Sequence, residues 1–212
     1  VYKQIKTNKF REENKMTITY ELGKSLYVNI TNRCSNACTF CVRKDEPTIN
    51  GVDDLWLEKE PTQEEILEDI LKRDLDQYDE LVFCGYGEPT YRLDEICAIA
   101  KEVKKNHTIP IRLNTNGHGN LIFKKDMTPL LKDAIDVVSI SLNAKNKSEY
   151  DELCRPVFED AYDELLEFAR LAGRYTKVVL TIVDILPIED QEACRRISQS
   201  VGAELRIRSY ID

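Results

Sequence analysis

Residues 34–41 read Cys34-Ser35-Asn36-Ala37-Cys38-Thr39-Phe40-Cys41 and follow an apolar run from Leu26 to Thr31. A strand followed by a loop with C-x3-C-x2-C spacing is expected to bring three thiolates together near the strand's carboxyl end. Soft sulfur ligands at short loop spacings suit an iron–sulfur cluster, and three of them leave one iron of a four-iron cluster open. The alternative is a structural zinc site, which needs four protein ligands, and the next cysteine along the chain is Cys84.

Length and composition restrict the class of protein. A chain of 212 residues is expected to form one domain, here residues 17–212, with residues 1–16 as an extension. The net charge of -8 argues against sequence-independent binding to nucleic acid. The sequence contains no apolar run of membrane-spanning length and no visible signal peptide. Seven cysteines, an odd number, indicate a reducing compartment, and we expect a cytoplasmic protein.

Apolar patterns alternate between strand-like and helix-like along the chain. The strand-like segments are 26–31, 80–84, 109–114, 137–142, 177–185 and 204–210. Helix-like segments follow them, notably from Pro61, 94–105, 159–172 and 189–200. Six such units predict an α/β fold, an incomplete (β/α)6 TIM-like barrel, with an open doubly wound sheet as the alternative. In either fold, ligands bind at the carboxyl ends of the strands.

The cysteine spacing, with Phe40 before the last cysteine, resembles the signature of the radical S-adenosylmethionine (SAM) superfamily. The resemblance implies that Cys34, Cys38 and Cys41 ligate a [4Fe-4S] cluster whose open iron chelates SAM. One electron, supplied by a flavodoxin- or ferredoxin-type protein, then cleaves SAM to a 5′-deoxyadenosyl radical. The resemblance to this superfamily also implies the incomplete barrel fold. The wider context, from Tyr20 to Asn36, is similar to a radical SAM subgroup named for its association with TatD-type nucleases.

Two further motifs follow the second and third predicted strands. The first resembles the superfamily's GGEP motif, whose backbone binds the SAM ammonium; it reads Gly85-Tyr86-Gly87-Glu88-Pro89, with Tyr86 in place of the first glycine. The second is similar to the family's Thr-Asn-Gly, so the resemblance implies that Thr115 and Asn116 contact SAM. The alternative for the second is an Asx-type turn with Gly117 at positive φ.

Polar residues also mark the fourth and fifth strands. Ser139, Ser141 and Asn143 alternate and therefore share one face. By resemblance, Ser141 and then Asn143 are the best candidates for contacts with the SAM ribose and carboxylate, and Asp184 lies at the level of the adenine. Hydrogen bonds within the core are the alternative for the strand residues, and a solvated carboxylate is the alternative for Asp184.

Four arginines are candidates for binding a substrate, because a guanidinium binds carboxylate or phosphate with two hydrogen bonds. They are Arg43, Arg155, Arg206 and Arg208. Ordinary surface ion pairs are the alternative, and the last two line the substrate side only if their face of the final strand points inward. Trp56 is either a lid over the cluster or an anchor for its own loop.

The sequence therefore predicts a radical SAM enzyme that abstracts hydrogen from a small molecule, a peptide or a protein. A glycyl-radical-enzyme activase is one alternative, and a non-catalytic, metal-stabilised interaction module is another. Cys84, Cys97 and Cys194 are predicted to be small core residues, so no auxiliary cluster is expected.

Overall fold

The computed structural model describes residues 16–41, 43, 48–49 and 53–209. Its main sheet has seven strands in the order β1-β2-β5-β6-β7-β8-β9. These strands are β1 Thr19–Leu22, β2 Ser25–Val28, β5 Glu80–Phe83, β6 Ile111–Thr115, β7 Val137–Ser141, β8 Lys177–Val183 and β9 Glu204–Arg208. The strands from β2 onward pair in parallel, whereas β1 forms an antiparallel hairpin with β2. The six parallel strands confirm the predicted α/β class.

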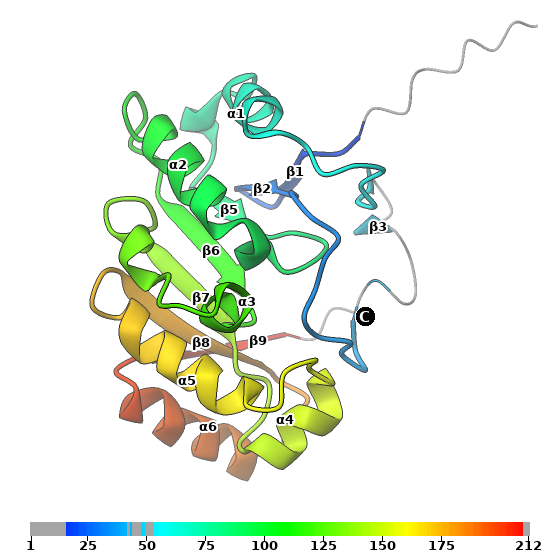
Figure 1. Ribbon diagram of the computed structural model, residues 1–212, viewed down its shortest axis with the longest axis vertical. Helices are drawn as coiled ribbons and strands as arrows, with labels where there is room; N and C mark the ends of the chain where they lie inside the picture. The colour runs from blue at the N-terminus through cyan, green and yellow to red at the C-terminus, as the bar shows by residue number, and fades with distance from the viewer. Residues whose placement is uncertain (1–15, 42, 44–47, 50–52, 210–212) are drawn as a thin grey trace, which may run out of the picture.

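The helices follow the strands in alternation (Figure 1). They are α1 Gln63–Leu71, α2 Leu93–Val103, α3 Gly119–Phe123, α4 Lys147–Cys154, α5 Ala161–Ala172 and α6 Ile188–Ser200. Short 3₁₀ turns occupy Leu75–Gln77, Pro89–Arg92 and Thr128–Leu131, and a small hairpin pairs β3 Thr48–Ile49 with β4 Asp53–Asp54. None of the helices in the described part of the chain is both long and apolar enough to span a bilayer.

Local sequence signals explain where two helices begin. The main-chain N–H of Glu65 donates to Thr62 Oγ1 at 3.2 Å and that of Thr62 donates to Glu65 Oε2 at 2.8 Å, a capping box that starts α1 as its sequence predicts. Helix α4 begins after Asn146, whose Oδ1 accepts from the Glu149 N–H at 2.9 Å. Asparagine is among the residues preferred at this position, and Ser148, two residues later, lies inside the helix.

The two faces of the sheet carry different side chains. The outer face is apolar and packs against the helices, with Leu81, Phe83, Leu113, Ile140 and Leu180 all buried in one core. Figure 1 shows α2, α5 and α6 along this side. The alternate positions form the inner face and include Tyr27, Arg112, Asn114, Ser139 and Thr181.

The sheet curls so that its distant strands face one another. Arg208 lies on β9, at the opposite edge from β2, yet its charge interacts with Tyr27 on β2 and with Cys84, which follows β5. A flat sheet would keep strands four or five positions apart beyond such range, since neighbouring strands are about 4.8 Å apart. The curvature supports the incomplete barrel over the open doubly wound sheet.

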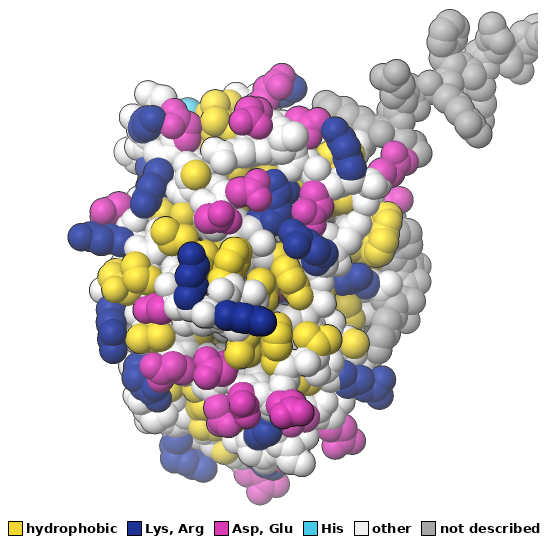
Figure 2. Space-filling view, viewed as in Figure 1, with side chains coloured by type: hydrophobic (Ala, Val, Ile, Leu, Met, Phe, Trp, Pro, Cys, Tyr) yellow, Lys and Arg dark blue, Asp and Glu magenta, His cyan; other side chains and the backbone are white. Residues whose placement is uncertain are grey.

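The surface around the helices is of mixed charge. Figure 2 shows Lys and Arg side chains interspersed with Asp and Glu on this face, with hydrophobic atoms between them. Such mixing is typical of a solvated face. This face gives no sign of a nucleic-acid-binding patch.

Candidate functional site

The cysteine loop, residues 34–41, is joined to the carboxyl end of α4. Main-chain N–H groups of Ala37 and Thr39 donate to the carbonyls of Cys154 at 3.0 Å and Leu153 at 2.8 Å. The carbonyl of Ser35 accepts from the N–H of Val157 at 2.9 Å. Figure 1 shows the chain after β2 running down to α4. The loop is therefore held by segments more than a hundred residues away in the sequence.

The three cysteines of the loop are free and half-buried. Burial raises the pKa of Cys34 to about 11, although the N–H of Asn36 donates to its Sγ at 3.4 Å and acts in the other direction. No three His, Cys, Asp or Glu side chains among the described residues lie close enough to hold one metal ion. In a four-iron cluster, in contrast, each cysteine binds a different iron. The three loop thiolates match the number of ligands that such a cluster needs, whereas a structural zinc site needs four protein ligands.

Cys154 is a fourth sulfur beside the loop, in contact with Cys38. Its thiol hydrogen-bonds with Cys38, which raises the pKa of Cys38 and lowers that of Cys154. The side-chain amide of Asn143 also donates to Cys154 Sγ at 3.5 Å. Sequence spacing cannot reveal this contact, since the helix that carries Cys154 is brought there by tertiary packing.

The Gly85–Pro89 turn packs directly on the segment that leads into the cysteine loop. The N–H groups of Gly87 and Glu88 donate to the carbonyls of Thr31 at 2.8 Å and Arg33 at 2.7 Å. A Cβ added at Gly87 would lie 2.2 Å from the Arg33 carbonyl oxygen, so no side chain fits there. The first glycine-rich motif thus positions the cysteine loop through its backbone.

Glu88 is the hydrogen-bonding centre that joins both motifs. Its buried carboxylate accepts from the N–H and Oγ1 of Thr90, at 2.9 and 2.6 Å, from Thr115 Oγ1 at 2.6 Å and from the N–H of Asn116 at 2.7 Å. Burial raises the pKa of Glu88, and these four hydrogen bonds oppose that shift. The site thus depends on a carboxylate placed among fixed donors.

We expect Glu88→Gln to lower the free energy of unfolding by about 2 kcal/mol, because its amide would oppose at least one donor, such as the Asn116 N–H. Thermal unfolding followed by circular dichroism should then shift down by roughly 5 °C. Glu58→Gln makes the same chemical change on an exposed side chain and should leave the midpoint unchanged. Equal midpoints for the two variants would contradict the role of Glu88.

His118 extends this network to the cysteine loop. The ring is fully buried, with Nδ1 3.0 Å from Ser35 Oγ and Nε2 3.1 Å from the Tyr150 hydroxyl. The amide of Asn116 donates to the same Ser35 Oγ at 2.8 Å, and that of Asn36 donates to the Tyr150 hydroxyl at 3.2 Å. Burial lowers the pKa of His118 to about 4, so at neutral pH the ring is uncharged and has a structural role.

This shift predicts a pH-dependent stability. An unfolded chain binds a proton at His118 near its ordinary value of 6.5, whereas the folded chain binds it only near 4. Unfolding is therefore favoured as pH falls from 6.5 to 4, and His118 alone should remove roughly 3 kcal/mol over this range. The raised pKa of Glu88 acts in the opposite direction, so the comparison must isolate the histidine.

Denaturant unfolding of the wild type and of His118→Gln at several pH values checks the predicted pH dependence of the free energy of unfolding. The wild type should lose more stability than the variant between pH 6.5 and 4. Because the chain has only two histidines, the ring signal of His118 is also easily followed in the wild type by NMR. A ring that titrates near 6.5 would contradict the prediction.

The structure places the candidate SAM-binding residues in different environments. Phe40 is half-buried and packs against the core, while Thr115 and Asn116 hydrogen-bond within the protein. Thr115 Oγ1 accepts from the N–H of Gly117, whose φ is +83°, so the turn reading of this motif is observed. Asp184 is exposed in the turn after β8, where its N–H donates to the Arg208 carbonyl at 2.9 Å.

Two buried amide oxygens near the cysteine loop lack hydrogen-bond partners in the described structure. They are Oδ1 of Asn36 and Oδ1 of Asn143. The backbone of Asn143 is in the left-handed region, with a φ of +61°. Ser141, on the inner face of β7, is half-buried. Buried acceptors without partners are costly, and a bound molecule with N–H or O–H donors would satisfy them. This supports a cofactor site beside the loop.

The candidate substrate-binding arginines lie in three places. Arg43 lies over the rings of Trp56 and Tyr86, 5.6 Å from each centroid, and Trp56 is exposed. Arg155 is exposed at the end of α4 with φ of +46°, and its carbonyl accepts from the Ala37 N–H at 3.3 Å. Arg206 and Arg208 lie on β9, facing inward.

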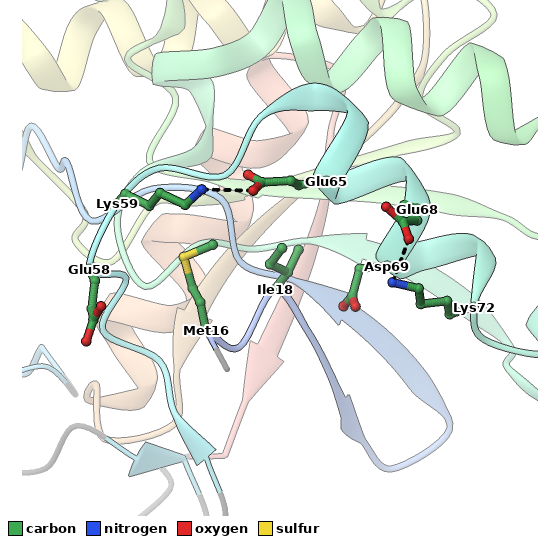
Figure 3. Close-up of a pocket in the computed structure, with 8 residues that line it drawn as sticks. All are labelled: Met16, Ile18, Glu58, Lys59, Glu65, Glu68, Asp69 and Lys72. Atoms are coloured by element: carbon green, nitrogen blue, oxygen red, sulfur yellow. Dashed lines mark hydrogen bonds and ion pairs between the residues drawn. The ribbon is translucent and has the colours of Figure 1, made fainter. Parts of the chain in front are cut away.

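A pocket of about 360 Å³ lies beside α1 and β1 (Figure 3). Its charged residues mostly bind one another: Lys59 pairs with Glu65 at 2.8 Å and Lys72 with Glu68 at 2.9 Å, as Figure 3 shows. Asp69 accepts from Thr19 Oγ1 at 2.7 Å. The pocket is therefore a structural junction between α1 and the hairpin, and no loop cysteine lines it.

Comparison with known proteins identifies the class. Residues 28–198 match the Radical SAM superfamily, and the chain belongs to it. The "Probable GTP 3',8-cyclase" of Methanocaldococcus jannaschii is 28% identical over 134 residues, which are 62% of this chain and 40% of that protein. Members of the superfamily are enzymes that use a [4Fe-4S] cluster and SAM.

Solved structures agree on the fold. TYW1 with a lysine-pyruvate adduct bound superposes with a TM-score of 0.62 at 15% identity, over 89% of this chain and 65% of that one. HydG, a maturase of the [FeFe]-hydrogenase, superposes with a TM-score of 0.62 at 16% identity, over 87% of this chain and 42% of that one. Methylornithine synthase (PylB) superposes with a TM-score of 0.58 at 17% identity, over 88% of this chain and 53% of that one. The chain thus spans about two thirds or less of each relative.

Proposed function

We propose that this chain cleaves SAM reductively and uses the resulting 5′-deoxyadenosyl radical to take a hydrogen atom from a substrate. The observation that carries the proposal is the C-x3-C-x2-C loop, which follows the parallel strand β2 in a chain of this superfamily. A [4Fe-4S] cluster, held by Cys34, Cys38 and Cys41, supplies the electron that this cleavage needs.

The protein's own residues position the cysteine loop and bind SAM. The Gly87 and Glu88 backbone and the Ser35–His118–Tyr150 contacts fix the loop that carries the cysteines. Asn143 Oδ1 and the Ser141 hydroxyl are the acceptors we assign to SAM, whereas Thr115 and Asn116 hold the Glu88 carboxylate beside the cysteine loop. Arg43, Trp56 and Tyr86 stack beside the loop and limit access of water.

We infer that the substrate is a small molecule or a peptide, and that a flavodoxin- or ferredoxin-type protein supplies electrons. The names of the similar proteins include a GTP cyclase, a methylornithine synthase and a hydrogenase maturase, so they do not point to one substrate. Seven free cysteines suit a reducing compartment such as the cytoplasm. The context around Cys34 supports placement in the TatD-associated subgroup.

Anaerobic reconstitution with iron, sulfide, a reductant and SAM tests the proposal. We expect a brown protein with about four irons per chain, as a [4Fe-4S] cluster requires, and release of 5′-deoxyadenosine measured by chromatography. A colourless protein that binds one zinc and forms no 5′-deoxyadenosine would instead indicate the metal-stabilised interaction module.

A further inference from the structure

The inner face of the sheet near β9 carries two arginines whose direction the pairing of β9 fixes. Arg206 lies opposite Thr181 and Arg208 opposite Val183 in the parallel register with β8. Their neighbours on β8, Leu180 and Ile182, point outward into the helix-covered core. Since side chains alternate along a strand, both arginines face inward.

A third guanidinium on this face is already neutralised. Arg112 on β6 binds Glu80 with two hydrogen bonds, Nε to Oε2 at 2.9 Å and Nη2 to Oε1 at 2.6 Å. Its Nη1 donates to Asn114 Oδ1 at 2.6 Å, and Ser25 Oγ donates to Glu80 at 3.0 Å. This buried ion pair forms the floor of the inner face.

Arg206 and Arg208 have no ion-pair partner within the part of the chain that the structure describes. At the start of the strand, Glu204 pairs with Lys177 at 2.9 Å, so that pair adds no net charge. Three guanidiniums and one carboxylate, Glu80, therefore leave two positive charges on this face of a chain whose net charge is -8. An excess of this kind favours an anionic ligand.

Arg208 lies near the end of β9, paired with Val183 of β8. Its side chain reaches solvent, yet partial burial lowers its pKa; Cys84 and Tyr27 oppose this shift, and the charges of Arg112 and Arg206 add to it. Cys84 is likewise partly accessible and also interacts with Arg208. Arg208 and Cys84 lie at the carboxyl ends of their strands, the edge of the sheet from which the cysteine loop also leaves.

We propose that Arg206 and Arg208 bind the oxyanion of a small carboxylate- or phosphate-bearing substrate on the inner face of the barrel. Calling this ligand the substrate rests on the proposed function; the binding itself does not. Guanidinium forks match both kinds of oxyanion. The inner face also carries the Tyr27 hydroxyl and the Asn114 amide, which can hydrogen-bond a polar ligand, beside Val82, Val137, Val179 and Val183.

Titration of the purified protein with sodium phosphate, and separately with sodium succinate, tests the proposal without cluster or SAM. Ionic strength is held constant with sodium chloride, and arginine Nε–Hε signals are followed by NMR. We expect saturable chemical-shift changes with at least one anion. The anion that binds more tightly shows whether the ligand's oxyanion is a phosphate or a carboxylate. Arg206→Gln and Arg208→Gln should each weaken binding about tenfold, as loss of a charged hydrogen bond does.

Arg195→Gln is the matched control, because it removes the same charge from an exposed position on α6 that faces away from the sheet. It should leave the dissociation constant unchanged. Equal weakening in Arg195→Gln, or no saturable shift with either anion in the folded wild type, would overturn the proposal. Because formation of 5′-deoxyadenosine is measured separately, either proposal can fail while the other stands.

Discussion

Gly87→Ala is expected to lower the free energy of unfolding by at least about 3 kcal/mol, because the new methyl group has no space. It would lie 2.2 Å from the Arg33 carbonyl oxygen and 2.6 Å from the carbonyl carbon of Asn32. Both are backbone atoms of the segment that enters the cysteine loop, so relief requires that loop to move. The thermal midpoint should fall by roughly 10 °C.

Gly173→Ala provides the control for this prediction. Its φ is -59°, and an added Cβ would make only ordinary contacts of 3.5 Å at the end of α5. Replacing such a glycine reduces the entropy of the unfolded chain and should be neutral or stabilising by up to about 1 kcal/mol. If both variants unfold at the wild-type temperature, the turn at Gly87 does not pack on the cysteine loop as described.

Cys38→Ala is expected to reduce formation of 5′-deoxyadenosine by at least about a hundredfold. Even changes to groups that only support metal ligands cost 10- to 100-fold, and this change removes a ligand itself. Iron content after anaerobic reconstitution should fall with it. The measurements are the rate of 5′-deoxyadenosine release and the iron bound per chain.

Cys97→Ala removes a thiol from the core of α2, far from the loop, and should keep both the iron and the activity. Cys154→Ala tests whether the sulfur beside Cys38 is a further ligand. We expect its iron content to remain near the wild-type value, since the three loop cysteines suffice. Retention of activity in Cys38→Ala, or equal loss in Cys97→Ala, would contradict the assignment of the loop cysteines.

The strands and the two motif turns were readable from the sequence because their signals are local. Alternation of period two and of period 3.6 marks strands and helices, and the capping box at Thr62 marks the start of α1. Predicted ends differed by a few residues: the first parallel strand, expected over 26–31, is Ser25–Val28. Beyond Val28 the backbone bonds to turns instead of a neighbouring strand: the Thr31 carbonyl, for example, accepts from the Gly87 N–H at 2.8 Å.

The role of several polar residues depended on partners far along the chain. An exposed histidine titrates near neutral pH, but burial of His118 between Ser35 and Tyr150 keeps its ring neutral. Cys84, expected in the core, is half-buried on the inner face, whereas Cys97 and Cys194 are buried as predicted. No local pattern carries this information, because it depends on which elements pack together.

The sequence by itself determined the order of strands and helices and the C-x3-C-x2-C spacing of the candidate cluster ligands, because both depend on spacing between near neighbours. Only the tertiary structure decided that Glu88 joins both glycine-containing turns, that Cys154 touches Cys38, and that Arg206 and Arg208 face inward. Curling the sheet brings β9 round towards β2, and this long-range closure converts an edge-strand arginine into part of an interior surface.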